Sequence, residues 1–194
     1  MSILSRENSE RLFWLGRYSE RVYTGLRSII GSYAKNFSLD ETNPESAVFS
    51  LARAYDNAIV LRDEIGSETF SYIQLAVYEI NKAKKSLTPL IHLQKVIDNI
   101  AAFWGMADDS IEDEHARGII KLGKRIERVD LYSRMNANVE DIRREIRRLI
   151  YRLPKTGLRY DAETLERLIM LANDDSLKRP EIVKEVEGLI KFSE

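Results

Sequence analysis

The segment Leu15-Gly16-Arg17-Tyr18-Ser19-Glu20-Arg21-Val22 occurs a second time as Leu122-Gly123-Lys124-Arg125-Ile126-Glu127-Arg128-Val129, and the register holds as far as Arg27 and Arg134. Around both copies, apolar and small residues recur at steps of three and four, the spacing of one face of an α-helix. The two sets are Leu12, Leu15, Ser19, Val22, Leu26 and Ile29, and Ile119, Leu122, Ile126, Val129, Ser133 and Asn136. The repeat therefore predicts two long helices, each with a stripe that packs on a neighbour.

A glycine stands beside the stripe in each copy, Gly16 in the first and Gly123 in the second. Inside a helix, glycine costs about 1 kcal/mol relative to alanine. Its presence at two matching positions predicts that another helix or a ligand approaches the backbone closely there.

The repeat also carries a Glu-Arg pair, Glu20-Arg21 in the first copy and Glu127-Arg128 in the second. Neighbouring residues on a helix point about 100° apart, so the two members of a pair do not face each other. In a structural interpretation the helices cross, and Glu20 pairs with Arg128 while Glu127 pairs with Arg21. In the alternative, the arginines form a cleft for an anionic ligand, because guanidinium groups suit carboxylate and phosphate. The two interpretations are compatible.

Four further charged residues complete this candidate cluster. Arg17 and Lys124 directly follow the two glycines, whereas Arg62 and Asp63 lie in a separate apolar segment, residues 57–65. Charged side chains embedded so closely among apolar ones are typically partnered inside a protein. We therefore expect Arg62 and Asp63 to be paired in the interior.

Composition limits the classes of function. The 194-residue chain has 30 basic and 31 acidic residues, which argues against a protein dedicated to duplex nucleic acid. The absence of cysteine excludes disulfides, thiolate metal sites and a cysteine nucleophile. No signal-peptide core follows Met1, and no apolar run approaches the roughly 20 residues of a membrane span. We expect a cytoplasmic protein that does not enter the membrane.

Helical patterns dominate the chain, which has only four prolines and nine glycines. They predict an all-α, up-and-down bundle with two long motif-bearing helices and short C-terminal helices. Residues 1–153 are expected to form the bundle and residues 154–194 a C-terminal helical extension packed on the same domain. The expected helices are 7–35, 44–65, 68–87, 89–104, one that enters through the acidic stretch 108–115 and reaches 136, 139–153, 162–172 and 181–192.

Local signals give the expected boundaries of these helices. Pro44 suits a first helical turn, Ser67 and Thr88 are expected to cap the helices that follow them, and Gly105 is expected to end a helix. The core candidates between Ser67 and Thr88 are Phe70, Ile73, Leu75, Val77 and Ile80.

Two other charged groups are candidates for chemistry. Glu112-x-x-His115 matches half of a carboxylate di-iron motif, but no second copy exists, so we predict no metal and no cofactor. A basic face is formed by Arg143, Arg144, Arg147, Arg148 and Arg152. Interleaved acids make pairing along a solvated helix the first interpretation of this face, and binding of phosphate or RNA the second.

Several motifs resemble those of the alpha-E domain family, a bacterial helical family named for its helices and its Glu-Arg motif. They span residues 4–134, and the helices after Asn136 have no counterpart in the resemblance. The matching segments are Trp14 to Arg21, Asn43 to Ser46, Asn57-Ala58, Leu61 to Asp63, Ser67-Glu68 and Leu122 to Arg128.

This resemblance implies a place beside circularly permuted ATP-grasp enzymes and transglutaminase-like proteins, which are the partners that we expect. The favoured function is thus a non-catalytic helical component of a bacterial ATP-grasp amide-ligase or peptide-modification system, with no catalytic residue of its own. One alternative is an enzyme or binding module that uses the Arg/Glu cleft for an anionic or peptide ligand. Another is a nucleic-acid-binding bundle that uses the basic face. Self-association into a homo-oligomer stays open.

Overall fold

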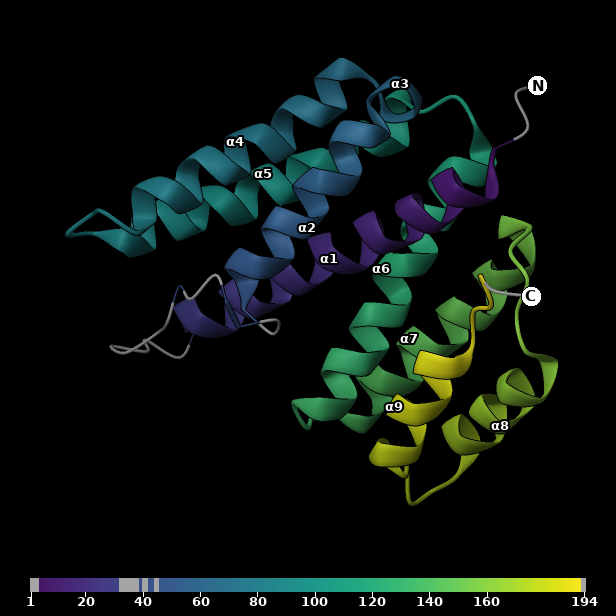
Figure 1. Ribbon diagram of the computed structural model, residues 1–194. Coiled ribbons are helices and arrows are strands. Elements are labelled where there is room, and N and C mark those ends of the chain that lie inside the picture. Colours follow the sequence, from purple (N-terminus) through teal and green to yellow (C-terminus); the bar gives the residue numbers. More distant parts are fainter. Residues whose placement is uncertain (1–3, 32–38, 40–41, 44–45, 193–194) are drawn as a thin grey trace.

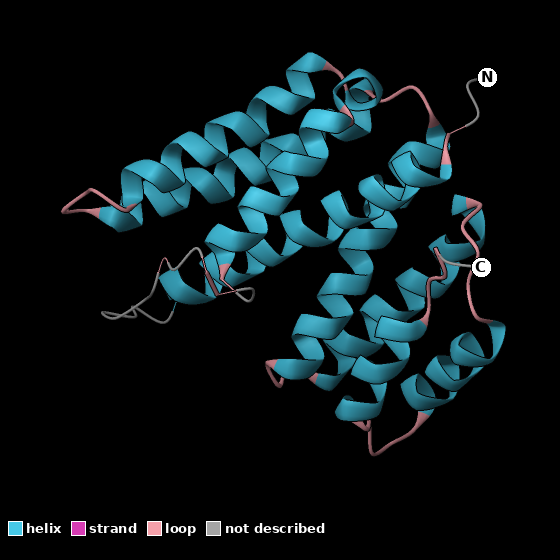
Figure 2. Cartoon of the chain, viewed as in Figure 1, coloured by secondary structure: helices cyan, strands magenta, loops and turns pink. Residues whose placement is uncertain are grey.

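The computed structural model describes residues 4–31, 39, 42–43 and 46–192. Within these residues the chain is all-α, as predicted, and its only extended pairing is an isolated bridge between Tyr160 and Ile190 (Figures 1 and 2). The helices are α1 (Arg6–Gly31), α2 (Ala47–Val60), α3 (Arg62–Ile65), α4 (Ser67–Ala83), α5 (Pro89–Ser110), α6 (Glu114–Arg134), α7 (Val139–Arg152), the 3-10 helix η1 (Leu153–Thr156), α8 (Ala162–Asn173) and α9 (Arg179–Gly188).

Two helices, α1 and α6, organise the bundle (Figure 1). On one side of their crossing, α1 packs against α2 and α5, and α4 and α5 form a long antiparallel hairpin. On the other side, α6 packs against α7 and α9, and α8 fills the space beside α7 and α9. The helices after η1 therefore lie on the same body as α6 and α7, although a domain boundary at residue 153 stays a prediction.

The predicted stripes of the two motif helices are the centre of the core. Leu12, Leu15, Val22 and Leu26 are fully buried on α1, and so is the polar Ser19. The stripe of α6 is equally buried, with Ile119, Leu122, Ile126, Val129 and Ser133. The prediction fails only at the ends of the stripes: Ile29 is half-buried, and Asn136 lies beyond the end of α6 with a φ of 53°.

The prediction that Gly105 ends a helix is wrong. The helix continues through this residue to Ser110, so Asp108 and Asp109 belong to the end of α5 rather than to the entry of α6. The penalty of about 1 kcal/mol for a helical glycine is smaller than the roughly 1.5–3 kcal/mol gained by burying one large apolar side chain. Phe103 and Ala107, on either side of Gly105, are both buried. The next helix instead begins after Asp113, whose carboxylate caps it.

Some predicted helix starts and one predicted core residue also differ from the structure. Gly66, not Ser67, precedes α4, and Thr88 precedes Pro89 without a side-chain capping bond. Leu75 is 46% exposed and lies outside the core, unlike Phe70, Ile73 and Ile80. The helix α2 begins after Ser46, whose hydroxyl accepts from the backbone of Phe49; the expected first turn at Pro44 lies outside the described residues.

No helix among the described residues is long and apolar enough to cross a membrane.

Candidate functional site

The two motif helices cross at the two motif glycines. A Cβ atom on Gly16 would lie 2.2 Å from the carbonyl oxygen of Ile120, and one on Gly123 would lie 2.1 Å from that of Phe13. Both distances are far below any real carbon–oxygen contact, so only glycine allows the backbones to come this close. Phe13 and Ile120 occupy matching positions in the two copies of the repeat. The crossing is therefore reciprocal, and the predicted close approach is that of a helix.

The two Glu-Arg pairs interlock across this crossing, in the pairing predicted from the repeat. Nε and Nη2 of Arg128 donate to Oε1 and Oε2 of Glu20, both at 2.8 Å, and Nε of Arg21 donates to Oε1 of Glu127 at 2.5 Å. The side chains of Glu20 and Glu127 are fully buried. Burial acts to lower the pKa of both arginines, but the bonded glutamates outweigh it and raise these pKa values. Both arginines are thus held in their charged forms.

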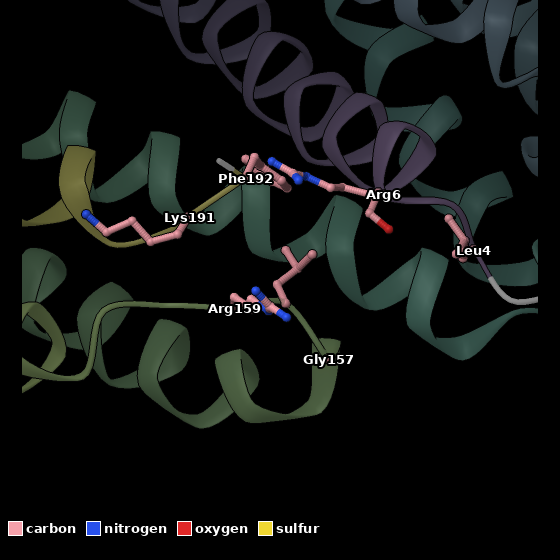
Figure 3. Close-up of a pocket in the computed structure, with 8 residues that line it drawn as sticks. Leu4, Arg6, Gly157, Arg159, Lys191 and Phe192 are labelled. Atoms are coloured by element: carbon pink, nitrogen blue, oxygen red, sulfur yellow. The ribbon is translucent and has the colours of Figure 1, made fainter. Parts of the chain in front are cut away.

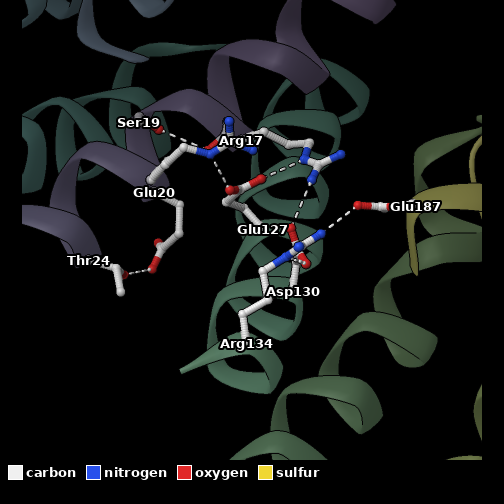
Figure 4. Close-up of polar contacts among 10 residues, drawn as sticks. Arg17, Ser19, Glu20, Thr24, Glu127, Asp130, Arg134 and Glu187 are labelled. Carbon is white, nitrogen blue, oxygen red and sulfur yellow. Dashed lines mark hydrogen bonds and ion pairs between the residues drawn. The ribbon is translucent and has the colours of Figure 1, made fainter. Parts of the chain in front are cut away.

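On the Glu127 side, the pair extends into a chain of alternating charges (Figure 4). Nε of Arg17 donates to Oε2 of Glu127 at 2.7 Å, and its Nη2 lies 3.6 Å from Asp130. Arg134 bonds Asp130 at 2.6 Å and Glu187 of α9 at 2.7 Å. Burial raises the pKa of Asp130, and the bond from Arg134 offsets only part of that effect. This chain ties α9 to the crossing.

The Glu20 side has a different set of neighbours. The hydroxyl of Thr24 donates to Oε1 of Glu20 at 2.9 Å. Lys124, which matches Arg17 in the repeat, lies over the ring of Trp104 at 3.3 Å from its centroid. The indole of Trp104 contacts the ring of Tyr23 and donates to Ser19, which anchors α5 on α1. Burial lowers the pKa of Lys124 to about 8, although Glu20 acts in the opposite direction. Aromatic rings thus replace carboxylates on this side.

The surface is hollowed on the Glu20 side. We call this hollow the α1–α6 groove; its volume is about 490 Å³, and its lining residues are Glu20, Tyr23, Thr24, Arg27, Ser28, Trp104, Arg128, Tyr132 and Met135. A second hollow, of about 340 Å³, lies between the start of α1 and the segments around Gly157 and Phe192 (Figure 3). Its basic residues are Arg6, Arg159 and Lys191, but Lys191 extends away from the other two. Of these two hollows, only the α1–α6 groove is lined by residues of the Glu-Arg pairs.

The other two members of the predicted cluster lie elsewhere. Arg62 and Asp63 are exposed on the short helix α3, so the expectation of interior partners is wrong. The guanidinium of Arg62 lies over the ring of Phe70, 5.6 Å from its centroid. The backbone N–H of Leu61 donates to Asn57 and that of Ile65 donates to Leu61, so the helical spacing continues and buries Leu61 and Ile65 rather than the charged residues between them.

The basic face of α7 is largely occupied by contacts within the protein. Arg143 donates to the backbone carbonyls of Ala172 and Asp174 at the end of α8. Arg144 bonds Asp141, and Arg148 bonds Glu145. These pairs are three residues apart, as expected for charges along one helix.

No metal-binding arrangement is present among the described residues, where no group of three or more His, Asp or Glu side chains is placed to hold an ion. Glu112 and His115 are both exposed at the start of α6. The second histidine, His92, bonds Glu79 of α4 through Nδ1 at 2.7 Å. The hydrogen bond from His92 is the main cause of a lowered pKa at Glu79.

Three residues of the site were missed by sequence reasoning. Asp130 and Glu145 are buried acids, and Glu145 is bonded by Arg125 and Arg148. The helical spacing could have identified both, because each acid lies three or four residues from a residue of the buried face. For Trp104 the sequence pattern predicts only a helix end. The signal that points to a larger role is general: a large aromatic residue with one polar atom usually finds a partner for that atom when it is buried.

The chain was also compared with known proteins. Residues 30–148, more than half of the chain, match the Alpha-E family, described as a predicted alpha-helical domain with a conserved ER motif. Neither the curated proteins nor the solved structures give a match. The matched segment contains the second Glu-Arg pair and most of α7, but starts after the first pair; the span of 4–134 expected from the motifs is therefore shifted. With this match and an all-helical fold built around its Glu-Arg motifs, the chain belongs to the Alpha-E family.

Proposed function

We propose that this protein is a non-catalytic helical component of a bacterial, cytoplasmic ATP-grasp amide-ligase or peptide-modification system. The resemblance of its motifs to those of proteins encoded beside ATP-grasp and transglutaminase-like enzymes suggests the partners. The role proposed for the chain is to bind and position, while the partner forms the amide bond.

The observation that carries this proposal is the state of the motif glutamates. Both oxygens of Glu20 accept from Arg128, and both oxygens of Glu127 accept from Arg17 and Arg21. A general base needs a carboxylate with a free lone pair directed at the substrate and a pKa near the working pH. A buried carboxylate whose two oxygens are both bonded by arginine directs no free oxygen at a substrate. The conserved motif of the family therefore serves the helix crossing in this chain.

Among the alternatives, an enzyme with its own Arg/Glu cleft has less support. A catalytic cleft would bring Glu20, Arg62 and Glu127 to one cavity, whereas the α1–α6 groove is lined by Glu20 alone of the three. A nucleic-acid-binding face on α7 is weakened by the internal contacts of Arg143, Arg144 and Arg148. A binding module with a cleft for an anionic ligand is favoured by the groove itself.

The proposal is tested by co-purification and reconstitution. A tagged full-length chain, expressed in its native host, is expected to co-elute with an ATP-grasp or transglutaminase-like protein encoded beside it. The purified partner, given ATP, an amine and a carboxylate peptide, is expected to form amide faster with the chain than without it. The chain alone is expected to form none. Amide formation by the chain alone, or a partner whose binding and rate ignore the chain, would refute the proposal.

A further inference from the structure

The repeat makes it possible to compare the two sides of the crossing position by position. Arg134 on α6 matches Arg27 on α1, and Asp130 matches Tyr23. On the Glu127 side, Arg134 is bonded by the carboxylates of Asp130 and Glu187. On the Glu20 side, a tyrosine takes the place of the first carboxylate.

Arg27 accordingly has an aromatic neighbour where its counterpart has acidic ones. Its guanidinium lies over the ring of Tyr23, 5.6 Å from the centroid, and donates to the Tyr23 hydroxyl at 3.4 Å. Among the described residues, no carboxylate forms an ion pair with Arg27. Arg27 is exposed and lines the α1–α6 groove.

Arg128 adds a second set of donors to the same groove. It uses Nε and Nη2 for Glu20, and a guanidinium carries five N–H groups, so the two on Nη1 are not used by this pair. Its side chain is 19% exposed at the groove wall. Glu20 does not compete with a ligand carboxylate for Arg27, because both of its oxygens already accept hydrogen bonds from Arg128 and Thr24.

The remaining lining of the groove combines aromatic and apolar residues with the hydroxyls of Thr24 and Ser28. Tyr23, Trp104, Tyr132 and Met135 form most of it, and Met135 is 49% exposed. The volume of about 490 Å³ lies within the roughly 300–1,000 Å³ of small-ligand clefts. Two guanidinium groups beside such a surface complement a carboxylate that has an apolar or aromatic neighbour.

We propose that the α1–α6 groove binds a peptide carboxylate, held by Arg27 and Arg128 with its neighbouring side chain against Tyr23, Trp104 and Tyr132. The ligand takes the place that Glu187 fills on the opposite side of the crossing, since Tyr23 occupies the position that matches Asp130. A carboxylate is favoured over other anions because a carboxylate fills that equivalent place. The peptide nature of the ligand rests on the proposed function; an amide ligase consumes a carboxylate, and this component would present it.

Trp104 supplies the signal for a direct test. The chain has two tryptophans, so Trp14→Phe in the full-length protein leaves Trp104 as the only one. The first probe is acetyl-Ala-Glu-Phe-Glu-Ala-amide, and its matched control has glutamine for both glutamates. A third peptide, with glutamines but a free C-terminal carboxylate, distinguishes a side-chain carboxylate from a chain end. We expect a saturable change in Trp104 fluorescence with at least one carboxylate peptide. The uncharged control is expected to bind at least about ten-fold more weakly than that peptide.

Arg27→Gln is the decisive variant. Because Arg27 is exposed, its replacement should leave the melting temperature unchanged while binding weakens about ten-fold. Arg53→Gln removes the same charge from an exposed residue of α2, a helix that does not line the groove, and is expected to keep full affinity. Equal binding of the glutamine control, equal loss in the two arginine variants, or tighter binding of inorganic phosphate than of every carboxylate peptide would each overturn the assignment. Because the chain is assayed alone, these outcomes are independent of whether a ligase partner co-purifies.

Discussion

Replacing Gly123 with alanine tests the closeness of the α1–α6 crossing most directly. The added Cβ atom would meet the carbonyl oxygen of Phe13 at 2.1 Å, whereas real Cβ atoms stay beyond 3.0 Å. Since the obstacle is backbone, no rotamer change relieves it, and the helices must separate by about 1 Å. Overpacking of this kind costs about 3 kcal/mol at its usual upper end, and better helix propensity returns about 1 kcal/mol. We therefore expect Gly123→Ala to lose about 2 kcal/mol of unfolding free energy, or about 4–8 °C in melting temperature.

The chain provides a matched control within one of the crossing helices. Gly25 lies on α1, like Gly16, but a Cβ there meets nothing within 4 Å. Gly25→Ala is expected to stabilise by about 0.5–1 kcal/mol, since alanine is the better helix former. Gly16→Ala should behave like Gly123→Ala, because its Cβ would lie 2.2 Å from the carbonyl oxygen of Ile120. Thermal and urea unfolding followed by far-UV circular dichroism measure all three. If Gly123→Ala and Gly25→Ala shift the melting temperature in the same direction, the crossing is not as tight as described.

Two further predictions concern the charges around the crossing. Glu127→Ala removes the bonded carboxylate of both Arg17 and Arg21 and should cost about 3–5 kcal/mol, whereas Arg21→Ala should cost less because Arg17 still bonds Glu127. In thermal unfolding, the double variant should lose less than the sum of the two single variants. If single alanine variants at Glu20, Arg21, Glu127 and Arg128 all melt like the parent, the interlock is contradicted. Burial lowers the pKa of Lys124 from 10.5 to about 8, so the folded state binds fewer protons than the unfolded state between these values, and the unfolding free energy should rise with pH across that window. Urea unfolding at several pH values should therefore show the parent gaining on Lys124→Met from pH about 8 upwards, and a constant difference between the two proteins would show that Lys124 is not desolvated.

The sequence predicted the structure best where the contacts depend on the pattern along one face of a helix. The stripe spacing, the paired glycines and the opposite charges of Glu20 and Arg128 are all periodic features, and each predicted the crossing correctly. It was least informative where tertiary packing competes with a local signal. Gly105 failed to end α5 because the buried Phe103 and Ala107 outweigh a single glycine.

The candidate site was likewise predictable where it depends on the repeat and not where it depends on tertiary packing. Its reciprocal ion pairs follow from the repeat, but the roles of Asp130 and Trp104 depend on which helix lies beside each residue. Asp130 has a partner on α1 as well as on its own helix, and Trp104 reaches Ser19 from α5. The expectation for Arg62 and Asp63 is wrong because Ala58, Leu61 and Ile65 continue the buried face at steps of three and four, which leaves the two charged residues on the exposed side.

The crossing also constrains how the chain is made. The bonds of Arg21 to Glu127 and of Arg128 to Glu20 join residues 106 and 108 positions apart. Closing a loop of that length costs about 4 kcal/mol of chain entropy before any contact forms. During synthesis at about 5–20 residues per second, α1 leaves the ribosome about 5–20 s before α6. Throughout that interval Glu20 has no arginine of α6 to accept from. Burying the apolar stripe of α1 against a surface without a cation would therefore carry the cost of an unpaired buried charge. The glutamate that is buried in the finished fold thus also disfavours non-native packing of the nascent helix.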